Sequence, residues 1–129
     1  MKPTPLDEYP IHQTPLPMAR VASSDRNFYD RCYFNAHNGT DDFMLIAGAG
    51  IYPNLGVQDA FLLARSGDQQ YAVRKSDALD TRPMSHQVGS FRVEVIEPLR
   101  QLRLINDSPD DVVQCDLVWT QSFPAVLEQ

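Results

Sequence analysis

The sequence predicts an all-β protein built as an antiparallel meander. Short apolar segments of strand length recur at spacings of about ten to fifteen residues, and turn signals separate them. No segment keeps the apolar period of a helix over several turns. A meander of this kind must close into a barrel or stack as a sandwich, because open strand edges invite pairing with other chains. The chain of 129 residues is long enough for one such domain.

The first 28 residues are expected to form an arm rather than part of the sheet. Half of the ten prolines lie in the first 17 residues. Proline lacks a backbone donor and favours extended or polyproline conformations, so this segment should not be helical. Leu6 and Tyr9 are among the apolar side chains that would let it dock. We therefore divide the chain into a Pro-rich, partly docked arm, 1–28, and a β domain, 29–129.

Two hairpins are expected to open the β domain. The segments YDRCYFNAH and FMLIAGAGIY flank Asn38-Gly39. Asn-Gly is the strongest short hairpin signal, because both residues accept a positive φ. The segments VQDAFLLAR and QQYAVRKS flank SGD, which predicts a second hairpin of the same kind.

Three further strands are expected after SDALDTRPMSHQ, which is predicted to be a loop or at most one helical turn. SFRVEVIE alternates, with Phe91, Val93 and Val95 on one face. LRQLRLIN follows Pro98, and VVQCDLVW follows the loop NDSPDD, so the chain contains seven candidate strands.

Two glycines in LIAGAGIYPNLG are spaced as at the start of a nucleotide-binding loop, but they are better explained as strand residues. A dinucleotide fingerprint would need a third glycine where Pro53 stands, and a helix after it. Gly48 and Gly50 share the parity of Tyr52, so we expect a bare strip on one face of the strand against which another group packs. Pro53 to Gly56 would form the next turn, with Gly56 at positive φ.

The formal net charge of −6, from 17 acidic and 11 basic residues, argues against nucleic acid as a partner. Affinity for phosphates needs clustered Lys and Arg, whereas the basic residues here are scattered. The same argument disfavours an anionic membrane surface, and no apolar run is long enough for a membrane span. The N-terminus has no apolar signal region, which predicts a cytoplasmic protein.

No motif for catalysis or for a cofactor stands out. His12, His37 and His86 are isolated in the sequence, which predicts no metal site, and no nucleophile elbow or Walker loop occurs. Cys32 and Cys115 are expected to be reduced, buried thiols, because nothing indicates an oxidising compartment. We therefore expect no cofactor.

Polar side chains at positions expected to be interior are the best candidates for a ligand site. Asp59 has the parity of Phe61 and Leu63, an unusual place for a carboxylate. Buried polar groups must find partners, so such groups would either line a ligand cavity in a barrel mouth or bond the neighbouring backbone. The candidate polar and aromatic lining residues are Tyr33, Asn35, Tyr52, Asp59 and Trp119.

Four stretches together carry a resemblance: HQTPLPMARVASSDRNFYDRCYFNAH, GAGIYPNLGVQDAF, YAVRKSDAL and CDLVWTQSFPAV. They resemble the N-terminal part of a bacterial family, common in actinobacteria, that is related to hydroxyneurosporene synthase (carotenoid 1,2-hydratase) and to AttH-like proteins. The resemblance runs from about His12 to Val126. It implies two lipocalin-like β-barrel halves packed together, of which this chain would be the first, truncated at its C-terminus. In the characterised relatives, hydratases and cyclases, both halves shape a hydrophobic ligand pocket.

Three functions remain open. The leading hypothesis is a lipocalin-like barrel or half-barrel that contributes to a pocket for a small hydrophobic molecule, isoprenoid or lipid-like. The alternative is the N-terminal half of a hydratase or cyclase, a hydro-lyase type of enzyme in which Asp59 is the one candidate acid. The third is a scaffold for a missing second β domain, supplied by another chain or by a homodimer.

Overall fold

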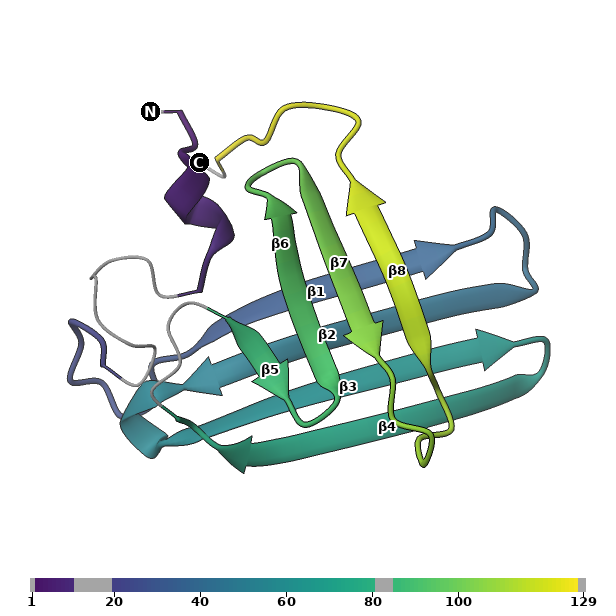
Figure 1. The fold of residues 1–129 in the computed structure, drawn as a ribbon, viewed down its shortest axis with the longest axis horizontal. Coiled ribbons are helices and arrows are strands. Elements are labelled where there is room, and N and C mark those ends of the chain that lie inside the picture. Colours follow the sequence, from purple (N-terminus) through teal and green to yellow (C-terminus); the bar gives the residue numbers. More distant parts are fainter. Residues whose placement is uncertain (1, 11–19, 81–84, 128–129) are drawn as a thin grey trace.

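The structure, a computed structural model, describes residues 2–10, 20–80 and 85–127. Eight strands form two antiparallel four-stranded sheets, ordered β1-β2-β3-β4 and β5-β6-β7-β8. Figure 1 shows the second sheet lying across the first, with the strands of the two sheets crossing steeply. The prediction of an all-β antiparallel meander is confirmed. Within the described ranges no strand ladder joins the two sheets, so the meander is split into two stacked layers rather than closed into one barrel.

The first sheet follows the predicted hairpins closely. Its strands are β1 (Asp30–His37), β2 (Phe43–Tyr52), β3 (Val57–Ser66) and β4 (Gln69–Ala78). The two hairpin turns place Gly39 and Gly67 at positive φ, as their turn chemistry requires. A short 3-10 helix, η2 (Pro53–Leu55), connects β2 to β3 and ends on Gly56 at φ 70°, which confirms the predicted turn.

The second sheet contains one strand that the sequence did not predict. Its strands are β5 (His86–Val88), β6 (Phe91–Glu97), β7 (Gln101–Asn106) and β8 (Cys115–Thr120). The segment SDALDTRPMSHQ, which ends at Gln87, was expected to be a loop or a helical turn. This expectation is wrong for its last two residues, which belong to β5, and for Asp77 and Ala78, which belong to β4. A strand of three residues is too short to show an alternating pattern, and its pairing with β6 is what makes it a strand.

The interior between the sheets contains small and large apolar residues from the first sheet and large ones from the second. The first sheet contributes Ala47, Ala49 and Ala60, which are almost fully buried. The second sheet places Phe91 and Leu104 opposite, both at most 1% exposed. Leu45 and Leu62 of the first sheet are buried in the same cluster, so both sheets contribute large side chains to the interior.

A polar network fastens the second sheet to the edge strand β4. Nζ of Lys75 lies 2.6 Å from Oδ2 of Asp111 in the loop between β7 and β8. Asn106 is fully buried and donates from Nδ2 to Asp111 at 2.9 Å and to the carbonyl of Val113 at 2.7 Å. Ser90 donates from its hydroxyl to Oδ1 of Asn106 at 2.8 Å, so both polar atoms of this buried side-chain amide have partners.

The arm contacts both sheets in the residues that are described. Contrary to the prediction that this segment has no helix, Pro5–Glu8 forms one 3-10 turn, η1, with Thr4 N donating to Asp7. The Glu8 carboxylate accepts a hydrogen bond from the backbone of Leu99, in the turn between β6 and β7. Val21 and Phe28 pack on Ile51 of β2. His12 lies outside the described residues.

Candidate functional site

The outer face of the first sheet, which points away from the second sheet, is arranged in four cross-strand rows. The strand registers place one residue from each strand in every row. The rows, from β1 to β4, are Arg31–Gly50–Asp59–Ser76, Tyr33–Gly48–Phe61–Arg74, Asn35–Ile46–Leu63–Ala72 and His37–Met44–Arg65–Gln70.

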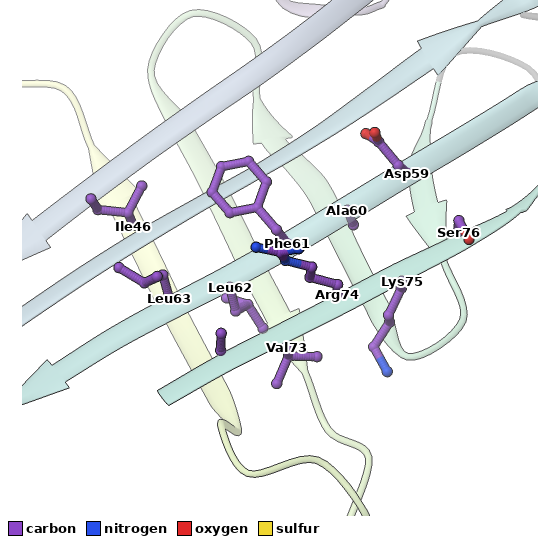
Figure 2. A pocket seen from close by; sticks show the side chains of 11 residues that line it. Ile46, Asp59, Ala60, Phe61, Leu62, Leu63, Val73, Arg74, Lys75 and Ser76 are labelled. Atoms are coloured by element: carbon purple, nitrogen blue, oxygen red, sulfur yellow. The ribbon is translucent and has the colours of Figure 1, made fainter. Parts of the chain in front are cut away.

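A groove of about 550 Å³ runs over this face between β2 and β4. Its apolar walls are Ile46, Phe61 and Leu63, and Arg74 lies directly across the strand pair from Phe61. Figure 2 shows the Phe61 ring and the Arg74 guanidinium on the same side of the sheet, with Asp59 farther along β3. The volume falls within the range that small-molecule pockets commonly have.

Gly48 provides the space for Phe61. A Cβ built on Gly48 would lie 2.7 Å from Cε1 of Phe61 and 3.0 Å from the carbonyl oxygen of Cys32. Such distances are shorter than van der Waals contact, so the ring can lie over β2 only because this position has no side chain. The strip without side chains that the sequence predicts at Gly48 and Gly50 is therefore present, and the Phe61 ring covers it at Gly48.

Gly50 provides the space for a cluster of three polar side chains, which we call the Arg31–Tyr52–Asp59 cluster. Arg31 Nη2 lies 3.2 Å and 3.3 Å from the two carboxylate oxygens of Asp59, and it also donates to the Tyr52 hydroxyl. That hydroxyl donates in turn to Asp59 at 3.2 Å. A Cβ on Gly50 would come within 3.1 Å of all three side chains.

Of the three members of the Arg31–Tyr52–Asp59 cluster, Asp59 borders the groove, and its charge is neutralised in a partly solvated ion pair with Arg31. Burial lowers the pKa of the Arg31 guanidinium, but the hydrogen bond to Tyr52 and the charge of Asp59 outweigh burial and raise it overall. The side chains of Arg31 and Asp59 are 35% and 42% exposed. An ion pair this open to water contributes little stability, so its main effect is to fix the three side chains in place.

The predicted lining residues divide between the two sides of the first sheet. Tyr33, Asn35, Tyr52 and Asp59 all lie on the outer face, and Tyr52 and Asp59 contact each other. Trp119 lies between the sheets, with its ring centroid 5.2 Å from that of Phe34. Asp59 was expected to be interior. This was wrong, because β3 turns Gln58, Ala60, Leu62 and Ala64 inward instead.

Arg31, Arg74 and Ile46 belong to the site but were not predicted from the sequence. Arg31 has the parity of Tyr33, and the Asn-Gly hairpin sets a register that places it opposite Gly50 and thus next to Asp59. Extending the predicted hairpin pairing across three strands would have brought these residues together. The signal was present in the register rather than in any local motif.

A second cavity, of about 400 Å³, opens between the sheets beside η1 and contains Cys32 and His86. His86 is 7% exposed, its Nδ1 has no hydrogen-bond partner, and burial lowers its pKa. Burial raises the pKa of the Cys32 thiol to about 11. A buried thiol with a raised pKa is a weak nucleophile, so this pair does not form an activated cysteine.

A third cavity, of about 490 Å³, lies near the β1–β2 turn, and none of the five predicted lining residues borders it. Both cysteines are free thiols and half-buried. Within 2–10, 20–80 and 85–127, no cluster of three His, Cys, Asp or Glu side chains could hold a metal ion. No helix in those same ranges is long and apolar enough to cross a membrane.

The outer face of the second sheet is entirely different in character. Arg103 binds Asp116 through two nitrogen–oxygen contacts of 2.7 Å, and this bidentate hydrogen bond lowers the pKa of the Asp116 carboxyl. Arg92 and Glu94 continue the ion pairs along the same face. Beneath them Ile105 is 3% exposed, so charged side chains cover the apolar one. Charged side chains dominate this face, on which Val118 is an exposed apolar residue.

The molecule is thus a two-sheet all-β protein with an apolar groove on one outer face and a network of ion pairs on the other. The chain belongs to DUF8625, a family of unknown function, whose model matches residues 3–129. Comparison with the curated proteins and with the solved structures gave no match.

Proposed function

We propose that this chain is a binding domain that holds a small hydrophobic molecule, isoprenoid or lipid-like, in the groove on the outer face of the first sheet. The observation that carries the proposal is the contrast between the two outer faces. Ion pairs occupy most of one, whereas the other presents Ile46, Phe61 and Leu63 around a groove. Contiguous apolar surface of this kind is uncommon on a protein that has no use for it.

The surroundings of the groove support the same proposal. Tyr33, Met44 and Val57, on the same face, are 58%, 42% and 43% exposed. Asp59 borders the groove with a carboxylate that Arg31 and Tyr52 hold in place, next to which a polar group of a ligand would lie. Apolar burial would supply the affinity, at about 25 cal/mol per Å² removed from water.

We further propose that the fold is a lipocalin-like half-barrel, and that a second β domain, from another chain or from a second copy, covers the groove. A groove on one sheet face buries only one side of a ligand, and small molecules in protein sites are usually enclosed on most sides. The resemblance to double-lipocalin proteins and the exposed apolar face both support this arrangement. They support equally the alternative in which the face serves only as a scaffold for that domain.

The enzyme alternative receives less support from the site. A hydratase or cyclase needs a positioned acid that faces the substrate in a site from which water is excluded. Asp59 is 42% exposed and is hydrogen bonded to Arg31 and Tyr52, at the end of an open groove. We therefore favour binding over catalysis for this chain.

Titration with the neutral fluorophore Nile red tests the proposal. The wild type should bind with an increase in fluorescence, and Leu63→Gln in the groove should weaken binding about fivefold, because part of the apolar wall is lost. Val118→Gln is the matched control, since Val118 is an exposed apolar residue on the outer face of the second sheet. Circular dichroism would check that both variants fold. Equal effects of the two substitutions, or no binding by the wild type, would overturn the proposal.

A further inference from the structure

Arg74 is a cation in the groove that has no ion-pair partner among the described residues. Arg74 lies beside Phe61 in the second row, on the edge strand β4, and it lines the groove. In Figure 2 its side chain extends from β4 toward Phe61 on the groove side. Among residues 2–10, 20–80 and 85–127, no carboxylate lies within ion-pair distance of it.

The other arginines on the same face have acceptors for their N–H groups. Arg31 is bound by Asp59 and Tyr52. Arg65 donates from Nε to the carbonyl of Gly67 at 2.9 Å, in the β3–β4 turn and away from the groove lining. The neighbouring Lys75 points to the inner side and is paired with Asp111 at 2.6 Å. Arg74 is thus the cation that remains available to a ligand in the groove.

The distribution of charge on this face favours an anion. The chain as a whole carries a formal charge of −6. On the outer face formed by the four described strands β1–β4, however, the four rows contain three arginines and only one carboxylate, Asp59. Because Asp59 is already paired with Arg31, Arg74 sets the electrostatic preference of the groove.

A purely apolar ligand would be a poor fit to this arrangement. Covering the groove removes water from Arg74, and burying an unpaired charge is unfavourable unless an acceptor replaces that water. A carboxylate matches the planar fork of a guanidinium with two parallel hydrogen bonds.

From the groove and this lone arginine, we infer that the ligand is an amphipathic monocarboxylate whose apolar chain lies along Ile46, Phe61 and Leu63 and whose carboxylate binds Arg74. This inference rests on the proposed function, because it names the polar end of the molecule held in the same groove.

Displacement of Nile red by dodecanoate and by dodecan-1-ol at pH 8, below their aggregation concentrations, tests the inference. Dodecanoate should bind about tenfold more tightly than the alcohol, since a charge-assisted hydrogen bond is the difference between them. Arg74→Gln should remove that advantage, so that the two amphiphiles bind the variant with about equal affinity. Arg65→Gln is the matched control, because it removes the same charge from the same face outside the groove.

The outcomes separate the two proposals. If both amphiphiles displace Nile red equally from the wild type and from Arg74→Gln, the groove binds apolar ligands and the assignment to Arg74 is overturned. If Arg65→Gln lowers the affinity for dodecanoate as much as Arg74→Gln does, net charge accounts for the effect and the assignment is again overturned. If Nile red does not bind at all, the proposed function itself fails.

Discussion

Phe61 lies over Gly48 so closely that any side chain at position 48 would meet its ring, since a Cβ there would stand 2.7 Å from Cε1. This pair joins the two central strands on the groove side. It determines where the largest apolar side chain of the groove is held.

Gly48→Ala should destabilise the protein. Overpacking costs about 1–3 kcal/mol, which exceeds the roughly 0.5–1 kcal/mol that alanine recovers over glycine in backbone entropy. Urea unfolding of Gly48→Ala, of Phe61→Ala and of the double variant gives a double-mutant cycle. Gly48→Ala should cost less when Phe61 is absent. An equal cost in both backgrounds would show that the nearby carbonyl of Cys32, rather than the ring, excludes the side chain.

The Lys75–Asp111 pair should make stability depend on pH in the acid range. Hydrogen bonds from Lys75 and then Asn106 lower the pKa of Asp111 below its ordinary value of 3.8. The contribution of this carboxylate is therefore present above pH 3.8 and is lost as the pH falls through its lower value in the folded state. Between about pH 5 and pH 2, the free energy of unfolding of Asp111→Asn should fall by less than that of the wild type. Parallel curves for the two proteins would contradict this expectation.

His86 should produce a separate pH dependence nearer neutrality. Burial lowers its pKa below 6.5, although the charge of Asp30 opposes the shift. Because the unfolded chain takes up a proton more readily than the folded one, stability should decrease as the pH falls below 6.5 toward the folded-state value. Urea unfolding across this interval should give a flatter profile for His86→Gln than for the wild type. A slope that survives the substitution would assign the effect to other groups.

Cys32 should react slowly with iodoacetamide in the folded protein. Burial raises the pKa of Cys32 to about 11, from an ordinary value of 9.0, and raises that of Cys115 as well. At pH 8 the folded protein should therefore alkylate Cys32 about a hundredfold more slowly than the urea-unfolded chain, because the thiolate is the reactive form. Mass spectrometry of digests follows each site. Early modification of Cys32 in the folded protein would contradict its burial.

Alternation and turn chemistry were enough to predict most of the fold from the sequence. The Asn-Gly hairpin and the turn ending at Gly56 lie where they were expected, because these local backbone requirements do not depend on distant residues. The strand β5 was missed, because its three residues become a strand only through pairing with β6. The division into two sheets also depends on which strands remain unpaired, which no local pattern encodes.

The candidate site was predicted only in part, because parity does not tell which face points inward. The inner face of β2 and β3 is rich in alanine, with Ala49 opposite Ala60, whereas the outer face contains Phe61 and Leu63. Both faces therefore carry apolar side chains, since the inner face also holds Leu45 and Leu62, and parity alone leaves the choice open. The structure resolves the choice because the second sheet packs on the face that carries these alanines together with Leu45 and Leu62.

The groove gives one outer face of the domain an apolar area that the ion-paired part of the other face lacks. At a boundary between water and an oil-like phase, the ion pairs around Arg103 would stay hydrated while Phe61 and Leu63 turned toward the apolar side. The molecule would then take a preferred orientation at that boundary, with the ion-paired sheet face in water and the groove face in the apolar phase.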